Sequence, residues 1–137
     1  MALRTAPLLL VLLALAGCRG EGPEARIHRA FEAGRRAVEA GDGAGASQLL
    51  APGFSGPDGM DRAGARLYLT AVLGRQKVGV TVLGDRLEVQ GQRATQRVEL
   101  LLTGRAGQGL LPDESSRREL VIRWECRDGA WRIREVE

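Results

Sequence analysis

The sequence contains few of the residues that build most metal, redox and acid–base sites. It has one histidine, two cysteines, one tyrosine and two tryptophans in 137 residues. It has no Cys-x-x-Cys motif, no histidine and acid cluster at metal-ligand spacing, and no glycine-rich loop followed by lysine. We therefore expect neither a metal nor a cofactor, and no group of residues predicts a catalytic centre.

The charge is also close to balanced. Lysine and arginine together number 20 and aspartate and glutamate 17, with no block of five like charges. Aromatic residues make up 4% of the chain. A nucleic-acid surface combines clustered cations with stacking aromatics, so this composition excludes nucleic acid from the expected partners.

Long hydrophobic runs are absent as well. The longest apolar segment, residues 6–16, follows Arg4 and contains Pro7. A membrane-spanning helix needs about 20 apolar residues, so this segment is too short to remain in a bilayer. A cation, a short apolar run and small residues are instead typical of a secretory signal peptide. We predict that residues 1–17 are a cleaved signal peptide.

The end of this segment, Leu15-Ala16-Gly17-Cys18, resembles the lipobox of bacterial lipoproteins. The resemblance implies cleavage before Cys18, a diacylglycerol on its sulfur and acylation of its new amine. Residues 18–24 would then be a lipidated tether that holds the protein on a membrane of the bacterial envelope. Because Arg19 follows the cysteine, the resemblance favours the outer membrane, facing the periplasm, in a Gram-negative host. An ordinary signal peptide with a nearby free cysteine is the alternative.

The remaining 25–137 has the size of one domain. Apolar residues at helical spacing predict a helix over 25–40, with Ile27, Phe31 and Val38 on one face. A short helix over about 44–50 and a third helix, capped by Asp61 and running through Leu73, follow. The third helix is apolar on most sides, so we expect it to be deeply packed.

After the third helix the apolar residues recur at every second position and no longer every 3.6 residues, which predicts strands. Val78, Val80 and Val82 alternate, and Leu87 and Val89 continue on the opposite parity, so we expect a β-bulge or a bend near Gly84-Asp85. The next strand has a predominantly apolar inward set: Ala94, Gln96, Val98, Leu100 and Leu102. We expect residues 104–115 to be a long loop.

The final hairpin is the most completely specified part of the sequence. Asp128-Gly129 is a strong signal for a two-residue turn. It places Cys126 opposite Trp131 and Trp124 opposite Ile133 on the inner face. Glu125 then faces Arg132 on the outer face, where we expect an exposed ion pair.

The order of three short motifs resembles the nuclear-transport-factor-two-like superfamily, which includes SnoaL-like cyclases and ketosteroid isomerases. The motifs are Ala40-Gly41-Asp42, Phe54-Ser55-Gly56 and the closing segment 127–133. The resemblance implies an α+β cone, with about three N-terminal helices packed on a bent antiparallel sheet of about four strands. Many such domains form homodimers through the outer face of the sheet, and the enzymes among them use Asp, His or Tyr inside the cone.

Four inward residues are candidates for a ligand pocket: Tyr68, Gln96, Trp124 and Trp131. Each has an alternative role in the core, and Gln96 could instead hydrogen-bond a bulged backbone. We expect His28 at the surface, outside the cone, and Asp42, Asp58, Asp85, Asp113 and Asp128 in turns or loops.

Three functions follow from these expectations. The first is a lipid-anchored, non-catalytic cone that binds a small apolar ligand or a partner protein. The second is a SnoaL-like isomerase or cyclase, and the third is an adaptor that uses the outer sheet face.

Overall fold

The computed structural model describes residues 21–105 and 110–137, so Cys18 and the predicted signal peptide, residues 1–17, lie outside the described residues. The described chain contains helices α2 (Pro23–Glu39), α3 (Gly43–Ser47) and α4 (Arg62–Arg75), and a short 3-10 turn, η1 (Pro57–Gly59). Its strands are β1 (Leu50–Ser55), β2 (Lys77–Gln90), β3 (Arg93–Arg105), β4 (Leu110–Arg127) and β5 (Ala130–Val136). No helix within these residues is both long and apolar enough to cross a membrane.

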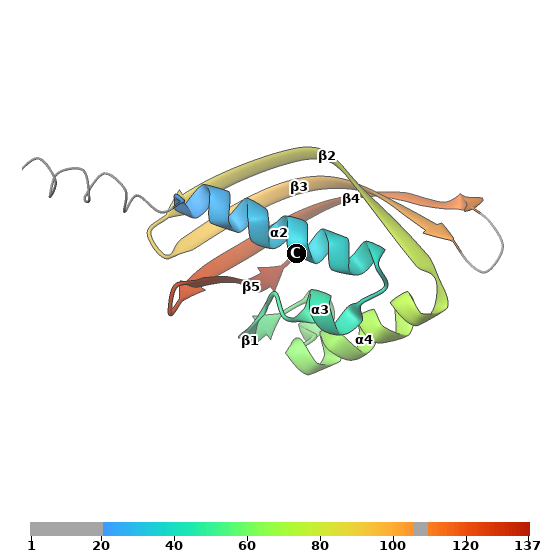
Figure 1. The fold of residues 1–137 in the computed structure, drawn as a ribbon, viewed down its shortest axis with the longest axis horizontal. Coiled ribbons are helices and arrows are strands. Elements are labelled where there is room, and N and C mark those ends of the chain that lie inside the picture. The colour runs from blue at the N-terminus through green and yellow to red at the C-terminus, as the bar shows by residue number, and fades with distance from the viewer. Residues whose placement is uncertain (1–20, 106–109) are drawn as a thin grey trace, which may run out of the picture.

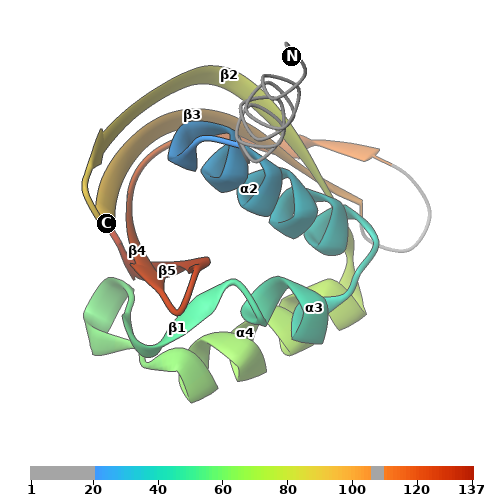
Figure 2. The same ribbon diagram turned by 60° about the vertical axis from the view of Figure 1, so that its left-hand side comes forward.

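The strands form one sheet in the order β1-β5-β4-β3-β2. Its long strands bend around α2, which lies across the concave side, while α3, α4 and β1 close the opposite side (Figures 1 and 2). The class is α+β, as the sequence predicts. The cone arises because α2 buries one narrow stripe, including Ile27 and Gly34, against the inside of the curved sheet.

The sheet has five strands, and the expectation of about four antiparallel strands was wrong. The additional strand, β1, pairs in parallel with β5 at one edge, so the sheet is mixed. Strand β1 was not predicted because its segment contains Pro52 and Gly53, two residues that disfavour strands. Proline removes a ladder donor and is tolerated on an edge strand, where one side of the backbone has no partner.

The predicted bulge in β2 is confirmed. The pairing of β2 with β3 shifts between Val82 and Gly84, which leaves Leu83 as the extra residue. The predicted loop over 104–115 was wrong at both ends, because β3 continues to Arg105 and β4 begins at Leu110. Residues 106–109 of that prediction lie outside the described residues.

The final hairpin has the predicted register in full. Cys126 pairs with Trp131, Trp124 with Ile133, and Glu125 with Arg132. Asp128 and Gly129 both have positive φ, 54° and 76°, as the two central residues of a type I′ turn require.

The expected exposure of Glu125 was wrong. Glu125 is only 8% exposed, because its strand lies between two others that place arginines beside it. Its register partners are Arg93 on β3 and Arg132 on β5. The predicted ion pair with Arg132 does not form, because Nη1 of Arg132 donates to the backbone oxygen of Gln48 at 3.1 Å. The carboxylate of Glu125 lies 3.8 Å from Nη2 of Arg127.

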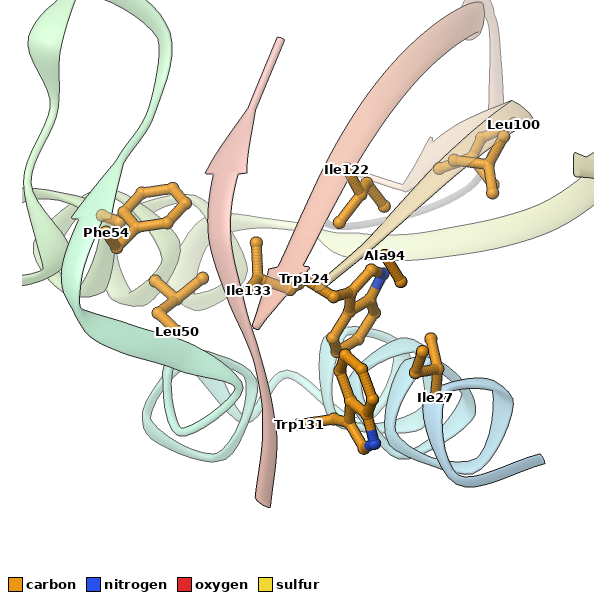
Figure 3. Close-up of a cluster of buried hydrophobic side chains, with 11 residues drawn as sticks. Ile27, Leu50, Phe54, Ala94, Leu100, Ile122, Trp124, Trp131 and Ile133 are labelled. Carbon is orange, nitrogen blue, oxygen red and sulfur yellow. The ribbon is translucent and has the colours of Figure 1, made fainter. Parts of the chain in front are cut away.

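The core fills the space between α2, the concave side of the sheet and β1. Trp124 and Ile27 are fully buried, and Trp131 is 8% exposed. Figure 3 shows the two indoles beside Ile27 of α2, with Leu50 and Phe54 of β1 at the other end of the cluster. Both tryptophans therefore act as packing residues in this fold.

The expectation that α4 is deeply packed was wrong. α4 buries Ala65 and Leu73, two residues eight apart and hence on one face. Leu67 and Tyr68 point away from that face and are 74% and 58% exposed. The sequence did not show this, because apolar residues on several sides of a helix do not reveal that only one side has a neighbour.

Candidate functional site

The β2 bulge creates the most polar group inside the cone. Val82 pairs with Leu100, and a regular strand would therefore place Gly84 opposite Val98 and turn Asp85 outward. The extra Leu83 instead puts Asp85 opposite Val98, whose side chain is buried in the core. The carboxylate of Asp85 is thereby aimed at the concave side of the sheet.

A chain of hydrogen bonds leads from Asp85 into the core. Nε2 of Gln96 lies 3.1 Å from Oδ1 and 3.2 Å from Oδ2 of Asp85. Nε1 of Trp124 donates to Oε1 of Gln96 at 3.0 Å. Gln96 and Trp124 are both fully buried. A flipped amide would set its NH₂ against the indole N–H and its oxygen against the carboxylate, so these partners fix the amide orientation.

Helix α2 brings His28 to the outer end of this chain. Its neighbour Ile27 is fully buried, which anchors this turn of the helix against the sheet. Nδ1 of His28 lies 3.4 Å from Oδ2 of Asp85, and the two side chains are 49% and 22% exposed. We call the set Trp124, Gln96, Asp85 and His28 the polar chain.

The geometry defines what the polar chain can do. Asp85 accepts from Gln96 on the core side and faces His28 on the solvent side. Nδ1 of His28 faces this carboxylate, so Nε2, on the far side of the ring, is the nitrogen left to meet a ligand. The exposed end of the chain therefore offers a carboxylate and an imidazole to a hydrogen-bonding ligand.

Three of the four candidate pocket residues come together in the cone, and one does not. Gln96, Trp124 and Trp131 all lie on the concave side. Gln96 bonds two side chains, Trp124 and Asp85, and not the bulged backbone that the sequence suggested. Tyr68 lies outside the cone, on the exposed side of α4, beside a hollow of about 400 Å³ that Ala71, Val72, Arg75 and Gln76 also line.

Sequence reasoning missed Asp85 and misjudged His28. Asp85 lies within β2 and not in a turn, and it shares its parity with Leu87 and Val89. The parity flip that predicted the bulge was therefore also the signal that Asp85 points inward. His28 is half exposed, as expected, but it contacts the carboxylate at the mouth of the cone and so belongs to the site.

Hydrogen bonds from arginines lower the pKa of two carboxyl groups away from the cone. A hydrogen bond from Arg35 lowers the pKa of Glu32 on α2, and one from Arg123 lowers the pKa of Glu137. Arg35 also reaches the backbone oxygen of Val80 at 3.4 Å, which ties α2 to the edge strand β2. Within residues 21–105 and 110–137, no group of three or more His, Cys, Asp or Glu is placed to hold a metal ion.

Comparison with solved structures decides the fold type. An uncharacterized protein from Caulobacter vibrioides with a cystatin-like fold superposes with a TM-score of 0.69 at 19% identity, over 85% of this chain and 87% of that one. A nuclear-transport-factor-two-like protein from Cytophaga hutchinsonii gives 0.69 at 14% identity, over 85% and 96%. The fold is nuclear-transport-factor-two-like, or cystatin-like.

Other proteins with this cystatin-like fold have names that point to activities. A candidate scytalone dehydratase from Novosphingobium aromaticivorans gives a TM-score of 0.66 at 13% identity, over 83% of this chain and 80% of that one. No family model matches the sequence, and no curated protein matches it. At these identities the cystatin-like fold is shared, and function has to be argued from the site itself.

Proposed function

We propose that this chain is a lipid-anchored protein of the bacterial envelope, whose small cone domain binds a small, largely apolar ligand without turning it over. The polar chain is the observation that carries the proposal. It ends in a half-exposed His28 and a partly exposed Asp85 at the mouth of an otherwise apolar cone. A ligand with one hydroxyl or amine could bond there while its apolar part contacts partly buried residues such as Leu87.

Packing of the cone favours binding over catalysis. Trp124, Gln96 and Val98 are each less than 2% exposed, so a ligand would meet the end of the polar chain and not enter the core. General acid–base catalysis needs a group held in reach of the reacting proton, and active sites gain by excluding water from that place. A half-exposed imidazole is poorly protected from water.

A ligand screen tests this proposal. Native mass spectrometry with a panel of steroid-like and polyketide-like compounds would be run on the wild type and on Asp85→Asn, with Asp58→Asn in the exposed η1 turn as the matched control. We expect ligands of the wild type to be lost from Asp85→Asn and kept by Asp58→Asn. Equal binding by all three proteins would contradict the assigned site.

An isomerase or dehydratase activity is the second candidate. The observation that favours it is the contact between His28 and Asp85, since a carboxylate that orients an imidazole leaves its second nitrogen free to move a proton. The candidate scytalone dehydratase with the same fold adds an analogy. If compounds in the panel are converted, and both His28→Ala and Asp85→Asn abolish the conversion, the protein is an enzyme.

The membrane anchor has its own test. It rests on Leu15-Ala16-Gly17-Cys18 alone. Metabolic labelling with a fatty acid should mark the wild type and not Cys18→Ser, and the mature wild type should begin at Cys18. A mature chain that begins elsewhere and has no acyl mass would leave an exported but unanchored protein.

The third candidate function is an adaptor that uses the outer face of the sheet. That face is strongly charged. That face pairs arginine with glutamate, for example Arg117 Nε with Glu99 Oε1 at 3.0 Å and Arg123 Nη1 with Glu137 Oε1 at 2.9 Å. A partner or a second copy bound there would have to match these charges.

A further inference from the structure

A second hollow lies outside the cone, between α3, β1 and the N-terminal half of α4. It is an open groove of about 510 Å³, with a lining that is both polar and apolar. The residues that line it are Ala44, Ser47, Gln48, Pro52, Asp61, Arg62, Ala63 and Arg66. The polar chain contributes nothing to it, so this groove is a separate candidate site.

Two arginines give the groove its charge. Arg62 and Arg66 are four residues apart, and they therefore lie on the same face of α4. Within the described residues neither arginine forms an ion pair. Like charges at this spacing repel each other, and an anion between them would relieve the repulsion.

Asp61 also lines the groove, and its carboxylate opposes an anion. Oδ1 of Asp61 accepts a hydrogen bond from the backbone N–H of Gly64 at 2.8 Å, which makes Asp61 the N-cap of α4. It therefore occupies the helix N-terminus itself. With one carboxylate and two guanidinium groups, the groove keeps an excess of one positive charge, located toward Arg66.

The chain segment that begins at the groove is basic and carries exposed apolar residues. From residue 62 to residue 84 the chain carries Arg62, Arg66, Arg75 and Lys77 and no acidic residue. The same stretch holds the exposed large hydrophobic residues of the described chain: Leu67, Tyr68, Val82 and Leu83. Leu67 lies four residues after Ala63, which lines the groove, so exposed apolar surface adjoins the groove at Leu67. Tyr68 lies on another side of α4 and lines the first hollow.

We propose that this groove binds a phosphate group through Arg62 and Arg66. A guanidinium presents a planar fork of donors that matches phosphate oxygens two at a time. The phosphate could come from a phospholipid headgroup, with its chains against Leu67, or from a soluble phosphomonoester. The site requires neither ligand binding in the cone nor acylation of Cys18.

The test uses the full chain in non-ionic detergent, titrated separately with glycerol 3-phosphate and with dihexanoyl phosphatidylglycerol. Binding is followed by ³¹P relaxation of each probe. We expect Arg66→Gln and Arg62→Gln each to weaken binding about tenfold, as the loss of one charge-assisted contact implies. Arg75→Gln is the matched control, because it removes one arginine of the same helix away from the groove, and it should change binding less than about twofold.

The variant Asp61→Ser should change the affinity for phosphate in the opposite direction. Serine can still cap α4, so the fold should be kept, as circular dichroism would verify, while the opposing charge is removed. We expect phosphate to bind several-fold more tightly to this variant.

Comparison of the two probes identifies the source of the phosphate. Equal affinities mean that the phosphate group alone is recognised, and a preference for the lipid of tenfold or more, lost in Leu67→Ser, means a headgroup with its chains. The proposal is overturned if neither probe binds saturably, or if Arg75→Gln weakens binding as much as Arg66→Gln.

Discussion

At the scale of single residues, Gln96 connects the apolar core to the polar mouth of the cone. It is fully buried and bonds the indole N–H of Trp124 on one side and the carboxylate of Asp85 on the other. Buried polar groups are costly when a partner is removed, because the remaining group loses its bond and stays away from water. Gln96 therefore contributes to the stability of the cone as well as to the site at its mouth.

Replacement of Gln96 tests this double role. We expect Gln96→Leu to lower the free energy of unfolding by about 1–3 kcal/mol, since it leaves the Trp124 N–H and part of the Asp85 carboxylate without partners. Gln90→Leu, the same change at an exposed position of β2, should cost less than about 0.5 kcal/mol. Urea unfolding measures both. Equal stability of Gln96→Leu and wild type would mean that water or another group replaces the amide.

A second prediction on stability concerns Glu125, on the outer face of the sheet. The residue is 8% exposed, and its carboxylate lies 3.8 Å from Nη2 of Arg127. We expect Glu125→Gln to cost about 1 kcal/mol, because the nearly buried carboxylate loses its attraction to this guanidinium. Glu88→Gln, at an exposed position of β2, is the control. Thermal melts in which both variants shift equally would show that the burial of Glu125 contributes nothing.

At the scale of elements, the contact between α3 and α4 depends on the absence of one side chain. A Cβ on Gly43 would lie 2.9 Å from backbone atoms of Thr70, closer than real contacts allow. A Cβ on Gly74, in the same α4, would meet nothing within 4 Å. The two glycines therefore have opposite roles, although both occur in helices.

The matched pair of alanine substitutions should change stability in opposite directions. Gly43→Ala must push α3 away from α4, and we expect a loss of about 1–3 kcal/mol as for other overpacked contacts. Gly74→Ala should gain about 0.5–1 kcal/mol from helix propensity. Differential scanning calorimetry would record both. A stabilised Gly43→Ala would show that the helices can separate without loss.

The Glu32–Arg35 pair gives a dependence on pH. The hydrogen bond from Arg35 lowers the pKa of Glu32 below its ordinary value, at a bond length of 2.9 Å from Nε to Oε2. A carboxylate whose pKa is lower in the folded state adds stability above its unfolded pKa, and this contribution is lost as the pH falls through the folded pKa. Glu32→Gln should therefore reduce stability at neutral pH, and the difference from wild type should vanish in acid. A difference that is constant with pH would contradict this linkage.

Some elements could be predicted from the sequence and others could not. The final hairpin was predicted to the residue, because Asp128-Gly129 permits only a narrow class of turns and the alternating side chains then fix the register. The β2 bulge was predicted because a change of parity is visible in one strand alone. Strand β1 was not, since Pro52 and Gly53 disfavour a strand and only the edge of β5 makes one possible there.

The candidate site was less predictable than the fold. Gln96 was recognised as unusual because its inward parity conflicts with its polarity. Its partners Asp85 and His28 could not be assigned to it, because their proximity depends on how α2 crosses β2 in space. Exposure of Tyr68 likewise depends on which side of α4 has a neighbour.

At the scale of the whole molecule, the charges of the outer face set the expected behaviour of any homodimer. A second copy bound through β3, β4 and β5 would contact the arginines and glutamates of this face. Salt screens interactions between exposed charges of this kind. We expect association through this face to weaken as salt is raised, as sedimentation velocity would show. Association that persists or strengthens in high salt would point instead to an apolar contact, such as the exposed residues of α4.

Because the cone is filled by side chains, the fluorescence of its tryptophans reports the state of the protein. Its two tryptophans, Trp124 and Trp131, are both in the core, so intrinsic fluorescence reports the interior with no background from surface indoles. Trp124 is joined through Gln96 to Asp85, and Asp85 faces His28 at the mouth. A molecule that displaces or protonates that end changes the electric field at an indole two hydrogen bonds away. Emission wavelength can therefore follow both unfolding and occupation of the mouth, without any added label.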